Sequence, residues 1–413
     1  MTIKALYPTV RPTLNLDFAK TKALDPRVTF TRASTATFVG ANGLIQTAAS
    51  GAARFDHNPA TGESLGLLVE EARTNNATYS EQFDNAAWIK AGGGVTITAN
   101  SIAAPDGTIT ADTYAGDGTS AMRYLVNTSD SSTGPKTISV FAKANTNNFL
   151  QLFFSGGVSS WANFNVSTGV VGSIGTLCTA SMQLLPGGWY RCILYTTDTT
   201  AVAPCLNLVT SSSSSRAESN TLSTSVYLWG FQAEAGAFPT SYIPTVASTV
   251  TRAADVASMT GTNFSSWYRQ DEGTAYIKTV NRSINSPAAP LVFSVGAGGF
   301  PFNELLEWDG TGSTNAILLR VFTTAGVQSA NITGTVNSAN NVNIAAGAFK
   351  LNNFAVSLNG NTPLVDNSGD LSAVDTLHIG KNWSTSRYSG TIARLAYYPV
   401  RLPDAQLQAL TAT

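Results

Sequence analysis

The sequence has few charged residues and very few histidines. Of its 413 residues, 12% are Asp, Glu, Lys or Arg, and the formal net charge is -1. That share is about half of what a soluble domain usually carries. Because Lys and Arg form no cluster, the chain lacks the positive surface that nucleic-acid binding needs, and we expect no nucleic-acid partner. With 2 histidines, little is left for histidine-based catalysis.

Cysteine and long apolar runs are also scarce. Cys178, Cys192 and Cys205 are too few for a disulfide framework, and their spacing is not that of a zinc site. We expect them to be small buried residues of a protein that folds in a reducing compartment. No apolar run approaches the roughly 18 residues of a membrane helix, which predicts no membrane insertion. Residues 1–18 lack the apolar stretch of an export signal.

Short alternating apolar runs are abundant instead. Hydrophobic residues make up 43% of the chain and the mean hydropathy is +0.04, so the low charge does not indicate disorder. In residues 137–143, the side chains of Ile138, Val140 and Ala142 fall on one face of a strand. Residues 189–195 are apolar on both faces, as in an inner strand. Such runs between Gly, Ser and Asn turns predict an all-β fold of β-sandwich or jelly-roll type.

The spacing of these runs divides the chain into three regions. Residues 1–75 are too broken to form a core, and we expect an extended arm that docks on a neighbour or a partner. Residues 76–247 predict one sandwich and residues 258–413 a second. In the second, Asn359-Gly360 is a strong hairpin signal, and Pro403 can begin a short terminal helix.

One short segment is similar in sequence to a second segment elsewhere in the chain. Residues 29–33 (TFTRA) are similar to residues 249–253 (TVTRA). The two could occupy equivalent positions or pack side by side. Chance similarity in a chain rich in Thr and Ala is the other explanation.

Several longer segments resemble known domain families. Residues 75–83 with Trp88, and residues 226–234, are similar to the first and last strands of carbohydrate-binding-module jelly rolls. Residues 354–360, 377–380 and 390–398 resemble a concanavalin-A-like (laminin-G-like) domain. The resemblance implies two sandwiches of these two kinds.

Other segments resemble bacteriophage virion proteins. They are residues 16–18, 30–37, 238–245 and 251–255. The resemblance is to tail-fibre or head-fibre (spike) proteins. It implies a homotrimer, docking to other virion proteins through residues 1–75, attachment to host-surface glycans, and a place in the virion after folding in the host cytoplasm. The alternatives are a capsid decoration or cement protein without a ligand, and a polysaccharide-active enzyme.

A catalytic constellation is missing from the sequence. Glu304, Glu307 and Asp309 come closest to the carboxylate pair of a glycosidase, but the alternate position after Asp309 is Thr311. Glu70 and Glu71 are adjacent and would point to opposite faces of a strand. The nucleophile, zinc and phosphate motifs are absent. We therefore expect a protein that is not an enzyme.

Sugar-binding candidates are aromatic rings beside planar amides. The first sandwich offers Trp161 with Asn163, and the alternative for Trp161 is core packing. The candidates in the second sandwich are Trp308, Asn382, Trp383 and Tyr388. For Trp383, which lies in a polar segment, a subunit contact is the other explanation.

A structural calcium is the only cofactor that the sequence leaves open. Asp366, Asn367 and Asp370 cluster in one segment, and Asp106 and Asp112 lie near one another. Neither cluster has a strict ligand spacing, and a turn rich in Asp and Asn is the preferred explanation of both. His57 and His378 lack a second ligand nearby in the sequence and are expected to be structural.

Overall fold

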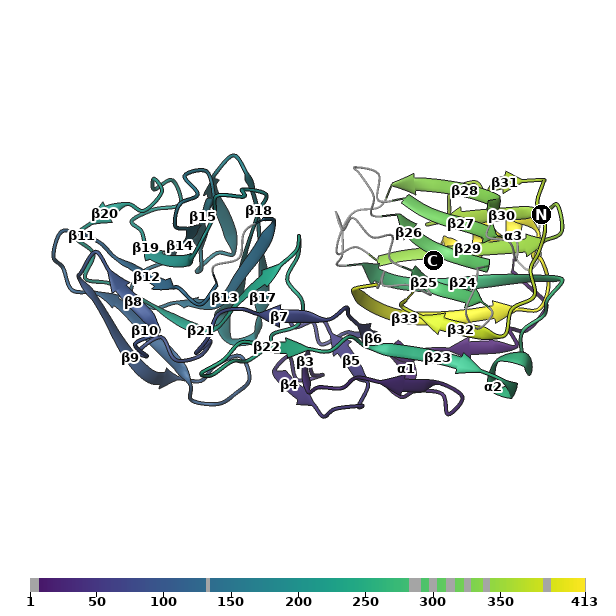
Figure 1. Ribbon diagram of the computed structural model, residues 1–413, viewed down its shortest axis with the longest axis horizontal. Helices are drawn as coiled ribbons and strands as arrows, with labels where there is room; N and C mark the ends of the chain where they lie inside the picture. The colour runs from purple at the N-terminus through teal and green to yellow at the C-terminus, as the bar shows by residue number, and fades with distance from the viewer. Residues whose placement is uncertain are drawn as a thin grey trace.

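The computed structural model describes residues 7–130, 134–281, 291–296, 303–309, 316–322, 328–336, 342–381 and 388–412. Two β-sandwich lobes lie along the long axis of the molecule (Figure 1). Helices are few and short: α1 (Phe18–Thr21), α2 (Thr262–Ser265) and α3 (Asp404–Thr411). None of the helices in the described ranges is long and apolar enough to span a membrane. The predicted all-β class with two sandwiches is confirmed.

The first lobe contains two six-stranded antiparallel sheets, here called sheet I and sheet II. Sheet I has the order β17 (Cys178–Leu185), β18 (Trp189–Thr196), β13 (Lys136–Ala144), β21 (Ser225–Ala235), β10 (Ala111–Gly116), β9 (Val95–Ile102). Sheet II has the order β16 (Val170–Ile174), β15 (Trp161–Asn165), β14 (Phe149–Phe154), β19 (Pro204–Leu208), β12 (Tyr124–Asn127), β8 (Trp88–Ala91).

Period-two alternation places the apolar residues of the first lobe between its sheets. Ile138, Val140 and Ala142 of β13 are all 0% exposed, as the alternation predicts. From sheet II, Leu150 and Leu152 point into the same core. The odd-numbered residues of β14 therefore lie on the opposite, outer face of sheet II, which matters for the site below.

The second lobe contains an eight-stranded sheet III and a seven-stranded sheet IV. The path through sheet III is β31 (Leu364–Asp366), β30 (Phe354–Leu358), β29 (Val342–Lys350), β24 (Glu272–Asn281), β33 (Gly390–Tyr398), β6 (Ser64–Val69), β5 (Arg54–His57), with β1 (Leu14–Leu16) also on β33. Sheet IV has the order β2 (Thr29–Thr31), β23 (Val256–Thr260), β32 (Thr376–Ile379), β25 (Leu291–Gly296), β26 (Asn303–Asp309), β27 (Ala316–Phe322), β28 (Gln328–Val336).

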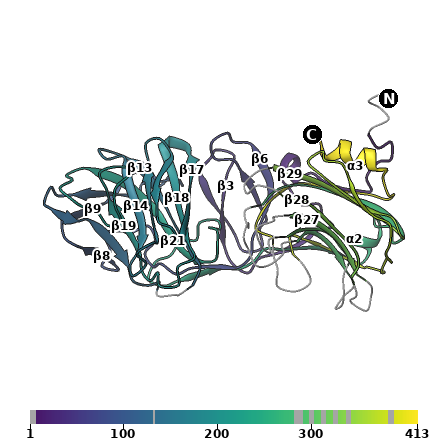
Figure 2. The same cartoon turned by 90° about the horizontal axis from the view of Figure 1, so that it is seen from above.

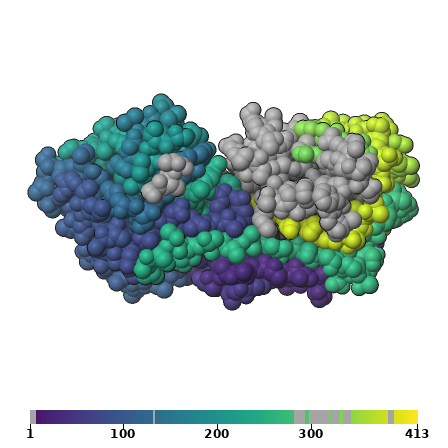
Figure 3. All heavy atoms as spheres, in the orientation of Figure 1, coloured from purple at the N-terminus to yellow at the C-terminus, as the bar shows by residue number. Residues whose placement is uncertain are grey.

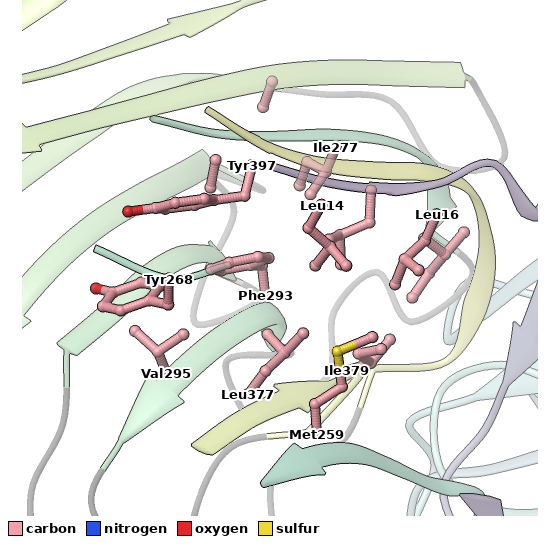
Figure 4. Packing of buried hydrophobic residues seen from close by; sticks show 14 of the residues in the cluster. Leu14, Leu16, Met259, Tyr268, Ile277, Phe293, Val295, Leu377, Ile379 and Tyr397 are labelled. Atoms are coloured by element: carbon pink, nitrogen blue, oxygen red, sulfur yellow. The ribbon is translucent and has the colours of Figure 1, made fainter. Parts of the chain in front are cut away.

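The structure differs from the expected N-terminal arm. Strands β1, β5 and β6 belong to sheet III, and β2 belongs to sheet IV. Leu14 and Leu16 are 1% and 3% exposed and lie in the core of the second lobe with Ile277 and Leu377 (Figure 4). The segment docks on a neighbour, as expected, but that neighbour is the C-terminal half of the same chain. Its strands are too short to form a sheet alone, so they complete sheets built by distant residues.

Two local signals in the second lobe are confirmed. Asn359 and Gly360 both have positive φ, 48° and 78°, at the turn between the antiparallel strands β30 and β31. Helix α3 follows Pro403, and its buried Leu407 packs on the outer face of sheet III beside Tyr398. Figure 2 shows α3 at the end of the molecule remote from the first lobe.

A buried charge cluster lies where the lobes meet. It consists of Arg32, Arg54, Glu70, Arg252 and Asp255, each at most 2% exposed. The Arg54 guanidinium is 2.9 Å from Glu70 and 2.5 Å from Asp255. Both Arg54 and Glu70 also hydrogen-bond Ser241, which follows the last strand of the first lobe. Figure 3 shows the N-terminal residues and the segment after the first lobe running along one side of the molecule between the lobes.

The repeated TxTRA segment supplies two arginines to this cluster. Arg32 is 3.1 Å from Asp255, and Arg252 is 3.5 Å from Glu70. The strands differ in their pairing, because β2 pairs with β23 while β22 (Val250–Arg252) pairs with β7 (Arg73–Asn75). The two copies thus converge on one charge cluster through different strand partners.

Candidate functional site

The outer face of sheet II carries the candidate site. It presents two neighbouring rows of side chains that run across the strands. In one row Asn163, Gln151 and Asn207 are opposite one another on β15, β14 and β19. In the other row Trp161, Phe153 and Cys205 hold the corresponding positions. Both rows follow from strand alternation, which turns every second residue away from the core.

The first row, here called the amide row, comprises Gln151, Asn163 and Asn207. All three residues are 0% exposed although they lie outside the sandwich core. The Gln151 amide nitrogen donates to the Asn163 side-chain oxygen at 2.7 Å. Amides side by side on a flat sheet present alternating donors and acceptors, which suits a ligand with both kinds of group.

The amide row is covered by residues 210–218, here called the strap. This loop joins β19 to β20 (Ser219–Asn220) and includes five consecutive serines. Asn163 donates to the carbonyl oxygens of Ser214 at 2.7 Å and Ser212 at 3.2 Å. Gln151 donates to the Ser215 carbonyl at 3.0 Å and accepts from the Ala217 N–H at 2.7 Å. The side chains of the row therefore bind the main chain of the strap.

Beside the strap lies an aromatic platform, defined as Tyr124, Phe153, Trp161 and Arg216. Tyr124 and Phe153 make an edge contact with ring centroids 5.5 Å apart. The Arg216 guanidinium carbon lies 5.0 Å from the centre of the Phe153 ring. Trp161 and Tyr124 are partly exposed, whereas Phe153 is 3% exposed. Two accessible rings thus flank a cation that is held over a third ring.

Of the predicted sugar-binding residues, Trp161 and Asn163 are brought onto this one face. Tyr388 is 0% exposed and its hydroxyl donates to the Thr391 carbonyl, so its ring cannot stack on a ligand. Asn382 and Trp383 lie outside the described residues. Trp308 is in β26, but its side chain is also outside what the structure describes.

The predicted calcium residues form turns. Asp366 accepts hydrogen bonds from the Ser368 N–H at 3.0 Å and hydroxyl at 2.9 Å, and Asp106 does the same with Thr108. Asp366 ends β31 (Leu364–Asp366), and Asn367 and Asp370 follow it in a segment without regular secondary structure. Across the described part of the chain, no three His, Cys, Asp or Glu side chains lie close enough to hold a metal ion.

Asp112 is the most perturbed of these carboxyl groups. Burial raises its pKa to about 6, although the backbone N–H groups of Asn100 and Phe83 donate to it and oppose the rise. It holds the β9–β10 region to the segment before β8. This role is structural, because both donors belong to the backbone.

The catalytic candidates do not form a site in the described residues. Glu70 belongs to the buried charge cluster, and Glu71 pairs with Arg73. The side chains of Glu304, Glu307 and Asp309 lie outside what the structure describes. His57 is 5% exposed with its Nδ1 3.0 Å from the Val39 carbonyl, and burial lowers the pKa of His378.

The three cysteines are free thiols. Cys192 and Cys205 are 0% exposed. Burial raises the pKa of Cys205 to about 12 and also raises the pKa of Cys178 and Cys192. The predicted burial is confirmed for Cys192 and Cys205, whereas Cys178 is half-buried at the start of β17.

Sequence reasoning missed Tyr124, Gln151, Phe153, Asn207 and Arg216. A signal was present for Gln151, since it is the one polar residue in the strand segment FLQLFF of β14. Asn207 likewise interrupts the apolar strand PCLNL of β19. Arg216 had no local signal, because its position over Phe153 depends on how the strap folds back.

No protein-family model matches the sequence, and no curated protein does. This chain is distantly similar in fold to solved structures of β-sandwich proteins. One is domain 4 of AbnA, a GH43 extracellular arabinanase from Geobacillus stearothermophilus, in complex with arabinotriose, with 12% identity over 42% of this chain and 80% of that one, and a TM-score of 0.29.

Two further structures cover more of the chain. Trypanosoma rangeli sialidase in complex with sialic acid has 11% identity and a TM-score of 0.29, and the match covers 73% of this chain but only 60% of the sialidase. Mouse laminin α1 domains LG4-5 have 10% identity and a TM-score of 0.23, over 70% of this chain and 92% of that one. At these TM-scores the similarity carries no argument about binding or activity.

Proposed function

We propose that this protein is a non-catalytic glycan-binding protein whose binding site is the aromatic platform of sheet II. The observation that carries the proposal is the pair of partly exposed rings, Tyr124 and Trp161, on one flat sheet face beside a row of amides. Sugars present apolar C–H faces and hydroxyl groups, so a site that combines aromatic rings with planar hydrogen-bonding groups matches both features.

The geometry supports weak binding to an extended ligand. Trp161 on β15 and Tyr124 on β12 are separated by two intervening strands, β14 and β19. Three strand spacings amount to roughly 14 Å, which is the length of a short oligosaccharide. Because the two rings lie on an outer sheet face and are partly exposed, we expect individual sites to be weak and several copies to be needed for firm attachment.

Binding of the full chain to an array of bacterial surface polysaccharides tests the proposal. Trp161→Ala should weaken binding at least tenfold, because stacking on the platform is lost, while leaving the fold intact. Tyr7→Ala is the matched control, since Tyr7 is also exposed, at 43%, but belongs to the other lobe. Equal binding by the wild type and Trp161→Ala would refute the proposal.

We also propose that the protein is a bacteriophage tail-fibre or head-fibre protein, located in the virion and assembled as a homotrimer. The support is the resemblance of residues 30–37, 238–245 and 251–255 to virion proteins. In the structure these residues line the junction between the lobes, with Arg32, Ser241 and Asp255 in or beside the charge cluster. Contacts with other virion proteins would use exposed residues of the region before residue 75.

Light scattering after size exclusion tests the oligomeric state. A mass near three times 43.2 kDa would support the trimer. A monomer in solution and in purified particles would refute it.

A polysaccharide-active enzyme is the rival with a direct test. It predicts depolymerisation of a bacterial polysaccharide that is lost in Glu307→Gln. Any such activity would overturn the non-catalytic proposal.

A further inference from the structure

The strap is bound almost entirely through polar groups. Residues 211–215 are all serine, and the strap contains no large apolar residue. Arg216 lies over Phe153 and donates to the Phe154 carbonyl at 2.7 Å, and Ala217 is the strap residue that packs against the apolar cluster containing Phe153. Such a segment covers the amide row with little of the apolar burial that makes a loop permanent.

The strap supplies the groups that a polyol would supply. The carbonyl oxygens of Ser212, Ser214 and Ser215 accept from the amide row, as hydroxyl or ring oxygens of a sugar would. The Ala217 N–H donates to Gln151, as a hydroxyl group would. The row contains no charged side chain, so its hydrogen-bonding pattern suits a neutral glycan.

One acceptor under the strap is left without a donor. Asn207 is 0% exposed, and its amide nitrogen reaches the Glu218 carbonyl only at 3.4 Å. Within the described residues, its side-chain oxygen has no hydrogen-bond partner. A buried acceptor without a donor is costly, and a ligand hydroxyl would remove that cost.

The strap is closed by a clamp at its base. The Glu218 carboxylate accepts from the Thr210 N–H at 2.9 Å and from the Thr210 hydroxyl at 3.0 Å. At its far side the strap passes so close to Gly172 that a Cβ there would lie 2.1 Å from the Ser212 carbonyl oxygen. Ala217 adopts a φ of 51°, which is unfavourable for a residue with a side chain.

We propose that the strap is an internal ligand of the amide row, and that a neutral glycan displaces it to bind Gln151, Asn163 and Asn207. This inference rests on the proposed function, since the platform would hold the glycan beside the strap first. The strap then sets the affinity: the ligand must compete with hydrogen bonds that the chain already makes.

Removing the strap tests the inference directly. Because Thr210 and Glu218 are in side-chain contact, residues 211–217 can be replaced by Gly-Gly in the full chain. This change also removes Arg216 from the platform, so Arg216→Ala in the intact chain is the matched control. The probe is a panel of linear neutral hexose tetrasaccharides, measured by calorimetry. We expect at least one to bind this variant tenfold or more tightly than the wild type, and Gln151→Leu in the same background to abolish the gain. A folded deletion variant with no gain would overturn the inference.

Hydrogen exchange of the intact protein provides a second test that does not depend on the deletion. The Ala217 amide should exchange much faster than the amides of β14, and faster still with saturating tetrasaccharide. Exchange of Ala217 only at the rate of global unfolding would overturn the inference.

The two proposals fail in different ways. If glycan binding by the wild type is lost in Trp161→Ala, but removal of the strap does not increase the affinity, only the strap inference is overturned. A gain on strap removal that is unaffected by Trp161→Ala overturns the platform as the first contact and, with it, this inference as stated. If neither the wild type nor the strap-deletion variant binds a glycan, the platform proposal and the strap inference are both overturned.

Discussion

Arg54→Met should strongly destabilise the second lobe and the junction. Arg54 is 0% exposed and contacts two carboxylates, Glu70 at 2.9 Å and Asp255 at 2.5 Å. It also donates to the Thr37 carbonyl at 2.7 Å and the Ser241 hydroxyl at 2.8 Å. Burial opposes the charged form, but the two carboxylates outweigh it and raise the pKa of Arg54, so the guanidinium is charged. Methionine has similar length and removes the charge and all these hydrogen bonds.

The expected loss of unfolding free energy depends on which ion pairs remain in the cluster without Arg54. Arg32 and Arg252 still face Asp255 and Glu70, but at the longer distances of 3.1 and 3.5 Å. Removing one partner of a buried ion pair costs about 3–5 kcal/mol of unfolding free energy, because the remaining charge stays buried. For an unfolding unit of about 200 residues, with an unfolding entropy of about 0.4 kcal/mol/K, this lowers Tm by about 7–12 °C.

Calorimetry and urea denaturation measure this effect. Arg27→Met is the matched control, since Arg27 pairs with Asp25 at 2.9 Å on the surface, where such pairs contribute about 0–1 kcal/mol. We also expect the first lobe to unfold separately in Arg54→Met, because the Arg54–Ser241 hydrogen bond is lost and Glu70, which accepts two hydrogen bonds from Ser241, loses the closer ion-pair partner that holds it in place. A loss below about 1 kcal/mol in Arg54→Met, equal to the control, would refute the argument that the cluster holds the junction.

Three further outcomes are expected. Leu14→Ala should cost about 2–5 kcal/mol in urea denaturation, because the side chain is 1% exposed in the core of the second lobe; a cost near zero would mean that the N-terminal strand is not part of that core. Burial raises the folded-state pKa of Asp112 above its unfolded value near 3.8, so the folded state binds more protons than the unfolded state between about pH 4 and 6. The free energy of unfolding therefore falls as the pH rises through that window. Asp112→Asn should flatten the pH dependence of the urea midpoint, and an unchanged slope would contradict the raised pKa of Asp112. Because Cys192 and Cys205 are 0% exposed and burial raises the pKa of both thiols, a thiol reagent should modify these two rapidly only after denaturation, while the half-buried Cys178 reacts first; rapid reaction of Cys192 or Cys205 in the native protein would count against their packing role.

Two residues of the candidate site were predictable from the sequence. Trp161 and Asn163 are two residues apart in an alternating strand, so a shared face followed from the period of a β-strand. That the face would also carry Gln151 and Asn207 depends on which strands become neighbours. The pairing of β14 with β19 joins residues at least 50 positions apart, and local sequence does not specify it.

The burial of the amide row could not be predicted from the sequence either. The serine run was recognisable as a loop, because nothing in it gains from burial. Where that loop would lie depends on hydrogen bonds to Gln151 and Asn163, which are distant in sequence and become aligned only after sheet II has formed. Tyr388 shows the converse, since its aromatic ring suited a sugar site in the sequence but is fully buried in the fold.

The sequence by itself determined the local structure: an all-β chain, the inward faces of strands such as β13, the Asn359-Gly360 turn and the helix after Pro403. These depend on alternation, on positive φ and on residues a few positions apart. Tertiary structure alone decided that strands β1, β2, β5 and β6 complete the C-terminal sheets, that Arg32 and Arg252 meet one charge cluster, and that the strap closes over sheet II. The physical reason is that backbone hydrogen bonds at a strand edge are alike for every partner. The choice among strand partners is therefore made by the packing of side chains between the sheets and by the buried charges at the junction between the lobes.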